Sequence, residues 1–213
     1  MMLLIIIALT TISIFIIYDK NNPNIYKFLS LGDGMSLGLN PLGVPSHNYN
    51  DYLISYLESK NKDVKYYNYS EKNMSIPELT NDIIYLKDKN LKEYLHTSNL
   101  IILSIGEDEI NKNKDKETIK EDLNNLLKEI KKYNNNICLL GRYNISEENK
   151  NKIKEINNIY KTIAKDNNVI YINIDNKNYY IKDINNYPSA LGYKEISKLI
   201  IKAMDLSNNS KID

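Results

Sequence analysis

Phe28-Leu-Ser-Leu-Gly-Asp-Gly-Met-Ser-Leu-Gly38 is the stretch that decides the fold, because an apolar run breaks at a Gly-Asp-Gly turn and an amphipathic segment begins after it. This order predicts a strand, a sharp turn and a helix. Glycine tolerates the positive φ angles that such turns need, and Asp33 can cap the helix that follows. In open α/β sheets the active site lies at the carboxyl ends of the strands, so this turn is the first candidate for a reactive site.

The composition is that of one globular domain without a nucleic-acid partner. The chain has 213 residues and a formal charge of +1, with acids and bases interspersed, which leaves no basic face for nucleic acid. Its one cysteine, Cys138, excludes an internal disulfide and a cysteine-based metal site. Cys138 lies in an apolar run, where cysteine behaves as a small hydrophobe.

The N-terminal residues from Met2 to Tyr18 are almost continuously apolar and end at Asp19-Lys20. As a helix this run would span about 26 Å at ~1.5 Å per residue, close to the ~30 Å hydrocarbon core of a bilayer. No small-x-small cleavage site and no cysteine for lipid attachment follow it, which favours an uncleaved anchor in residues 1–20 over a cleaved signal peptide. A buried helix of a soluble protein is the alternative, and the lack of a polar face argues against it.

From Asn24 onward short β-rich runs alternate with longer helical runs, which is typical of a parallel sheet with helices on both faces. The predicted strands are Tyr26–Leu31, Val64–Tyr69, Leu100–Ile105, Ile137–Leu140 and Val169–Ile174. The predicted helices are Tyr49–Ser59, Pro77–Lys87, Ile119–Tyr133, Glu147–Asp166 and Ala190–Met204. We therefore expect one α/β domain over residues 25–206 and a disordered tail over 207–213.

The first block resembles that of the SGNH/GDSL hydrolases, in which Gly-Asp-Ser follows the first strand and the serine is the nucleophile. Three further family landmarks have counterparts here by position: Asn68-Tyr-Ser-Glu-Lys-Asn-Met-Ser75, Ser104-Ile-Gly-Glu-Asp-Glu109 and Asp183-Ile-Asn-Asn-Tyr-Pro-Ser-Ala-Leu-Gly-Tyr193. The resemblance spans the chain from Tyr26 to about Met204. It implies a three-layer, flavodoxin-like α/β fold with a five-stranded parallel sheet, and hydrolysis of esters of lipids, acetylated sugars or cell-wall glycan.

The family's reactive positions hold other residues in this chain. Gly34 stands at the nucleophile position and has no side chain to attack with. Tyr187 stands at the histidine position, and a phenol with a pKa of ~10 is a poor proton acceptor near neutral pH. Asn73 replaces the second-block glycine. Asp108 replaces the asparagine that donates to the oxyanion, and an ionised carboxylate there would repel the developing charge.

These substitutions predict a catalytically degenerate relative, a chain more suited to binding than to catalysis. The family's orienting aspartate falls at Ile184, one residue after Asp183. A rearranged catalytic site would need Ser36, two residues past the turn, and His47, which belongs to a loop that could fold over it. His96 is predicted to lie at the opposite edge of the sheet, and we interpret it as structural.

Acidic residues gather at the predicted crevice, and two hypotheses account for them. Hard cations use carboxylate oxygens, so Asp33, Asp108 and Glu109 could hold one. In the structural alternative, Asp33 caps its own turn, Glu107 and Glu109 face water, and Arg142 pairs with one of the acids. We expect no cofactor. The residues expected to line the crevice are Asp33, Gly34, Met35, Gly106, Asp108 and Tyr187.

Three hypotheses for the function follow. The preferred one is a membrane-anchored, non-catalytic protein whose domain lies outside the cytoplasm and binds a glycan, a lipid or an envelope protein. The second is an ester hydrolase with a rearranged site, acting on acetylated glycan, cell-wall or lipid esters. The third is a purely structural envelope protein with a vestigial crevice. An open crevice would favour the first or second hypothesis, and a crevice plugged by Tyr187 and Met35 would favour the third.

Overall fold

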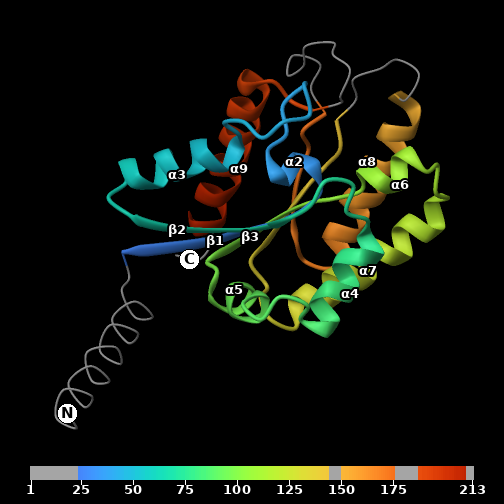
Figure 1. Ribbon diagram of the computed structural model, residues 1–213, viewed down its shortest axis with the longest axis horizontal. Coiled ribbons are helices and arrows are strands. Elements are labelled where there is room, and N and C mark those ends of the chain that lie inside the picture. The colour runs from blue at the N-terminus through green and yellow to red at the C-terminus, as the bar shows by residue number, and fades with distance from the viewer. Residues whose placement is uncertain (1–23, 144–149, 176–186, 210–213) are drawn as a thin grey trace, which may run out of the picture.

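A parallel sheet of five strands forms the centre of the computed structural model, which describes residues 24–143, 150–175 and 187–209 (Figure 1). The strand order is β2-β1-β3-β4-β5, and each neighbouring pair is parallel. The strands are β1 (Ile25–Gly32), β2 (Asp63–Ser70), β3 (Leu100–Ser104), β4 (Ile137–Leu140) and β5 (Ile170–Ile172). The predicted α/β architecture is confirmed.

Helices cover both faces of the sheet, which gives three layers (Figure 1). The helices are α2 (Gly34–Leu37), α3 (Tyr49–Ser59), α4 (Ile76–Tyr85), α5 (Leu91–Thr97), α6 (Glu107–Asn111), α7 (Lys116–Lys131), α8 (Lys150–Asp166) and α9 (Ala190–Asn209). Alternate residues of β1 point to opposite faces: Leu29 and Leu31 pack with α4, α5, α7 and α8, whereas Phe28 packs with α3 and α9. Both cores are formed of buried, mainly aliphatic and aromatic side chains.

Most predicted elements appear within a few residues of their expected bounds, and α3 and β4 match them. Helix α4 begins one residue before Pro77, because Ser75 forms a capping box with Glu78. Helices α5 and α6 were not predicted, since each is too short to show a helical period. Helix α9 continues to Asn209, so residues 207–209 of the predicted tail are helical.

Residues 1–20, the predicted anchor, lie outside the described part of the chain, and anchoring stays a prediction. Within residues 24–143, 150–175 and 187–209, no helix is both long enough and apolar enough to cross a bilayer.

Candidate functional site

The turn after β1 has the geometry that its sequence predicts. Gly32 has a φ of 132°, and a Cβ there would lie 1.8 Å from the Ser104 carbonyl oxygen, so only glycine fits. The backbone amide of Asp33 donates to that same carbonyl at 2.9 Å, which joins the ends of β1 and β3. The Asp33 carboxylate accepts from the Met35 amide at 3.2 Å and caps α2, as predicted.

The Asp33 carboxylate also forms a buried ion pair with Arg142, which follows β4. The Arg142 Nη1 atom lies 2.8 Å from Asp33 Oδ2, and the backbone amide of Glu107 donates to the same oxygen at 3.0 Å. Asn157 on α8 fixes the Arg142 backbone through two hydrogen bonds of 2.6 Å. Burial disfavours the charged guanidinium, but the carboxylates of Asp33 and Glu107 outweigh this effect and raise the pKa of Arg142.

Tyr187 fills the space beside Gly34. A Cβ built on Gly34 would lie 2.4 Å from the Tyr187 hydroxyl and 2.6 Å from two of its ring carbons, closer than packed atoms approach. The Tyr187 hydroxyl donates to both carboxylate oxygens of Glu107, at 2.8 and 3.0 Å. Burial, reinforced by the Glu107 carboxylate, raises the pKa of Tyr187 well above the ordinary value for a phenol. Tyr187 is therefore a neutral donor at this position.

Glu107 is the hydrogen-bond partner of Tyr187, a contact that the sequence did not reveal. Burial raises its pKa and the nearby Asp33 raises it further, whereas Arg142 and the Tyr187 hydroxyl act in the opposite direction. Lys72 also lowers this pKa. Glu107 follows Gly106 in a polar run after β3, and such a run gives no local signal for a contact with Tyr187. The one available signal was the coincidence of a missing side chain at Gly34 and a bulky one at Tyr187.

Glu107→Gln is expected to change how stability depends on pH. Because the folded state raises the pKa of Glu107, its ionised form is less favourable in the folded chain than in the unfolded chain. The wild type should therefore lose stability relative to the glutamine variant as pH rises from below ~4.3 through the folded-state pKa. Thermal unfolding across that range measures the difference. If the wild type instead became more stable relative to the variant as pH rises, the raised pKa of Glu107 would be contradicted.

The remaining family positions hold an exposed asparagine and an aspartate paired with a lysine. Asn73 is exposed in the connection to α4, with a positive φ of 62°. Asp108 is 7% exposed, and its Oδ2 atom lies 3.0 Å from Lys112 Nζ, so its carboxylate is neutralised by a lysine one turn along the chain. Ile184 and Asp183 lie outside the described residues.

The expectation that Glu107 and Glu109 face water is wrong. Glu107 is half-buried, and Glu109 is fully buried because α6 turns its side chain toward the start of α4. Glu109 Oε1 accepts from the Ile76 amide at 3.0 Å and from Lys114 Nζ at 3.1 Å. In the described part of the chain no three side chains of the metal-ligating types form a group that could hold an ion. The hypothesis of a cation site therefore has no geometric support.

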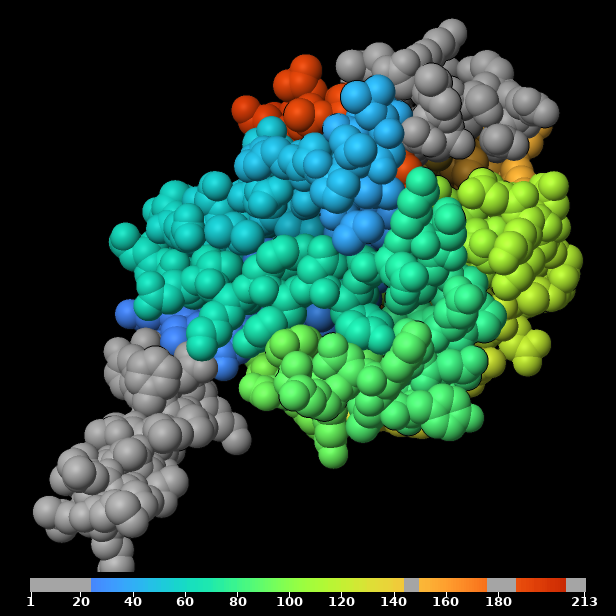
Figure 2. All heavy atoms as spheres, in the orientation of Figure 1, coloured from blue at the N-terminus to red at the C-terminus, as the bar shows by residue number. Residues whose placement is uncertain are grey.

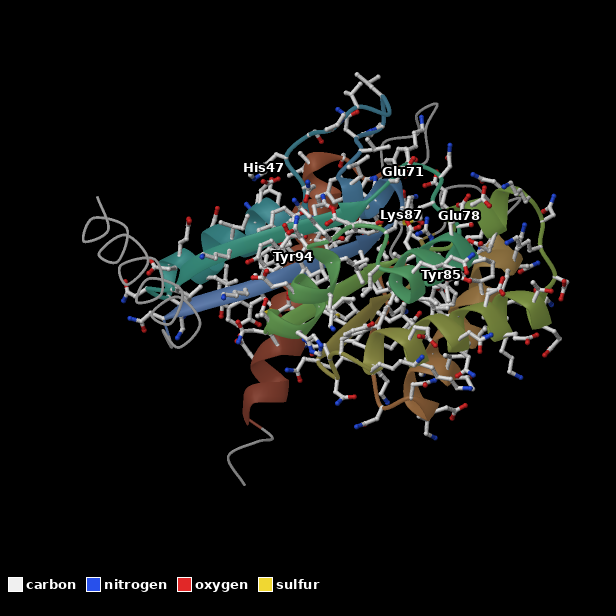
Figure 3. All side chains as sticks on the ribbon, turned by 60° about the horizontal axis from the view of Figure 1, so that its bottom comes forward. His47, Glu71, Glu78, Tyr85, Lys87 and Tyr94 are labelled. Atoms are coloured by element: carbon white, nitrogen blue, oxygen red, sulfur yellow. The ribbon has the colours of Figure 1, made fainter. Side chains whose placement is uncertain are left out.

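The structure does not bring Ser36 and His47 together. Ser36 is fully buried; its hydroxyl donates to the Leu31 carbonyl at 2.8 Å and accepts from the Tyr49 hydroxyl at 3.2 Å. His47 lies at the surface in the loop before α3 (Figure 3) and contacts Asp51, with 3.6 Å between His47 Nδ1 and the carboxylate. Each of the two residues thus has its own local role.

Three other residues singled out in the sequence have structural contacts. Met35 is fully buried in the core between α3 and α9 instead of lining an open crevice. A Cβ on Gly106 would lie 2.1 Å from the hydroxyl of Tyr160, which fills that end of the site. His96 ends α5 and packs edge-on against Tyr133, in keeping with a structural role.

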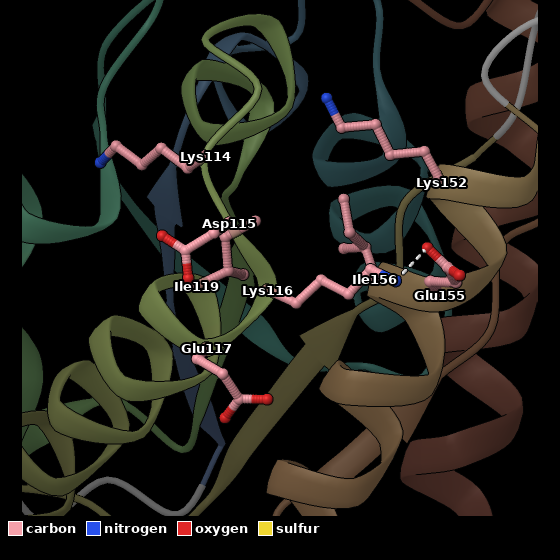
Figure 4. A pocket seen from close by; sticks show the side chains of 8 residues that line it. All are labelled: Lys114, Asp115, Lys116, Glu117, Ile119, Lys152, Glu155 and Ile156. Carbon is pink, nitrogen blue, oxygen red and sulfur yellow. Dashed lines mark ion pairs between the residues drawn. The ribbon is translucent and has the colours of Figure 1, made fainter.

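A hollow of about 530 Å³ lies elsewhere, between the amino-terminal halves of α7 and α8 (Figure 4). Ile119 and Ile156 contribute its apolar lining, and a 2.7 Å ion pair between Lys116 and Glu155 closes one side. None of the residues that line it belongs to the family's reactive positions.

No protein-family model matches the chain, and no curated protein matches it in sequence. Several solved structures match the chain in fold. The esterase EstA from Pseudoalteromonas sp. gives a TM-score of 0.67 at 15% identity, covering 86% of this chain and 98% of EstA. A family 3 carbohydrate esterase from Clostridium thermocellum gives 0.67 at 17% identity, covering 85% of this chain and 96% of that enzyme.

The acetyl xylan esterase Axe2 from Geobacillus stearothermophilus gives a TM-score of 0.66 at 15% identity, covering 84% of this chain and 94% of Axe2. These similarities extend over nearly the whole length of each enzyme. The chain has the SGNH-hydrolase fold.

Proposed function

We propose that this SGNH-fold chain is a membrane-anchored protein that does not hydrolyse esters through a serine nucleophile, and that it acts as a binding or structural protein of the cell envelope. One observation carries the proposal: the Tyr187 ring occupies the space that a nucleophile side chain on Gly34 would need. The hydrogen bonds to Glu107 hold the ring there.

The chemistry of acyl transfer supports this proposal. The reaction needs a nucleophilic oxygen, a base and donors to the oxyanion. Gly34 supplies no oxygen, Tyr187 holds its own proton, and Asp108, whose carboxylate is paired with Lys112, has no N–H to donate to an oxyanion. Loss of one oxyanion donor alone raises the activation barrier by about 3 kcal/mol. Loss of the nucleophile and the base removes most of the remaining rate enhancement.

The closed crevice also bears on where a partner binds. Tyr187 is 3% exposed and Met35 is fully buried, so the crevice predicted beside Gly34 offers little surface to a glycan or lipid. This favours a partner that docks outside the crevice, as in a structural envelope protein. The likeness to esterases keeps a rearranged ester hydrolase as the competing function, which an assay can separate.

We expect the purified full chain to show no hydrolysis of p-nitrophenyl acetate or acetylated xylan above buffer. Acetylated xylan is included because Axe2, which has a similar fold, is an acetyl xylan esterase. Ser36→Ala and His47→Ala run alongside as tests of the rearranged site. Clear activity in the wild type that both substitutions abolish would overturn the proposal and establish a displaced catalytic pair.

A further inference from the structure

The two edges of the sheet differ in their balance of charge, although both carry acidic and basic side chains. Because all the strands are parallel and the helices return between them, the helices end near the edge at which the strands begin, here called the amino edge. Acidic side chains open α3, α4, α6 and α7 at the opposite, carboxyl edge. Acidic side chains at the starts of helices and lysines at their ends both complement the helix dipoles. The two edges of the sheet therefore differ in charge.

Lysines outnumber acidic residues at the amino edge. The three connections that lead from α3, α7 and α8 into strands cover residues 56–62, 128–136 and 163–169. They contain six lysines and three acidic residues, and Lys60, Lys132 and Lys165 among them are exposed. This edge therefore has a surplus of positive charge in a chain whose net charge is only +1.

A hydrogen bond joins two of these connections, residues 128–136 and 163–169. Lys131 Nζ, at the end of α7, donates to the Asn167 carbonyl at 2.6 Å. Asn134 Nδ2 donates to the Ser98 carbonyl at 2.7 Å, which links the same region to the start of β3. The lysines of residues 128–136 and 163–169 are thus presented by hydrogen-bonded connections, and those of residues 56–62 lie at the start of β2 on the other side of the sheet.

The predicted anchor leads into this same edge. Residues 19–24 separate the apolar run from the first residue of β1, Ile25, whose register partner at the edge is Asp63. Six residues span at most about 20 Å. Figure 1 shows the start of β1 on the same side of the domain as the carboxyl-terminal end of α9. A chain anchored by its N-terminal run would therefore hold the amino edge close to the bilayer.

We propose that the amino edge docks on a bilayer surface that carries anionic headgroups and so directs the carboxyl edge, with Tyr187, away from the membrane. This inference rests on the anchoring in the proposed function. Lysine near an anionic leaflet strengthens attachment roughly fivefold per charge, and the effect fades within about 8 Å at physiological salt. The connection is short enough to let the edge enter that field but does not by itself hold the edge there, so the lysines must supply the attraction.

The test uses the full chain in lipid nanodiscs of phosphatidylcholine, with or without phosphatidylglycerol. We expect amide hydrogen exchange in residues 56–62, 128–136 and 163–169 to slow severalfold when phosphatidylglycerol is present, and high salt to remove the difference. The triple variant Lys60→Glu, Lys132→Glu and Lys165→Glu should lose the slowing. Lys120→Glu, Lys154→Glu and Lys194→Glu, exposed lysines toward the opposite ends of α7, α8 and α9, make the same change of charge and should keep it.

Two failures can be told apart. If the chain enters the discs and its exchange is the same in both lipids, the docking proposal is wrong and anchoring stands. If the chain does not enter the discs, the anchoring in the proposed function fails, and the docking that rests on it fails too. Since the comparison of lipids uses the wild type, the proposal can be refuted even if a charge-reversal variant does not fold.

Discussion

Arg142→Ala is expected to lower the free energy of unfolding by about 3–5 kcal/mol, the usual cost of removing one partner of a buried ion pair. Asp33 is fully buried and Arg142 is 5% exposed, with 2.8 Å between Oδ2 and Nη1. Without the guanidinium, the Asp33 carboxylate keeps its backbone donors but loses its counter-charge. Chemical denaturation of wild type and variant measures the loss.

The matched control for that substitution is Lys116→Ala, which removes an ion pair of similar length from the surface. Lys116 and Glu155 lie 2.7 Å apart, but both side chains are at least half exposed. Exposed pairs contribute about 0–1 kcal/mol, so this variant should be nearly as stable as the wild type. Equal, small losses in both variants would show that Asp33 and Arg142 are not buried as described.

Gly34→Ser is expected to destabilise the fold by about 1–3 kcal/mol, because its Cβ overpacks the site. The new atom would lie 2.4 Å from the Tyr187 hydroxyl, so the ring must move and weaken its bonds to Glu107. In a Tyr187→Ala background, Gly34→Ser should not lower the free energy of unfolding measurably. The two substitutions should therefore couple by about 0.5–3 kcal/mol in a double-mutant cycle.

Gly34→Ala separates the steric effect from any effect of the hydroxyl, since it adds the same Cβ without oxygen. We expect its loss of stability, followed by thermal unfolding, to match that of Gly34→Ser. Additive effects of the substitutions at Gly34 and Tyr187 would mean that the tyrosine does not fill the space beside the glycine. The explanation for the missing nucleophile would then be lost.

The sheet could be predicted because each strand has a local signal. β4 is a short apolar run between polar segments, and α3 starts at a polar residue that caps it, so both were predicted at their observed bounds. The turn at Asp33 could be predicted for the same reason. Asp33 caps the helix that begins at the next residue, so the contact joins neighbours in the chain and a short sequence pattern predicts it.

The contacts that close the site could not be predicted, because they join residues far apart in the chain. The family resemblance places Gly34 and Tyr187 in one crevice, but the sequence does not show that the Tyr187 hydroxyl bonds to Glu107. Glu109 lies in a polar run that resembles a solvated loop, yet a short helix turns it toward the amide of Ile76. Whether a carboxylate is buried depends on such distant partners. A prediction from the polarity of the residue alone would place it at the surface.

The most direct test of the central claim asks whether any serine of this chain reacts as an esterase nucleophile. The full chain is incubated with a fluorophosphonate and its intact mass is measured, with EstA from Pseudoalteromonas sp., whose solved structure is inhibited by monoethylphosphonate, as the positive control. We predict a modified control and an unmodified chain, since Gly34 offers no oxygen and the Ser36 hydroxyl is bound to the Leu31 carbonyl. A stoichiometric adduct on a serine of this chain would contradict the account.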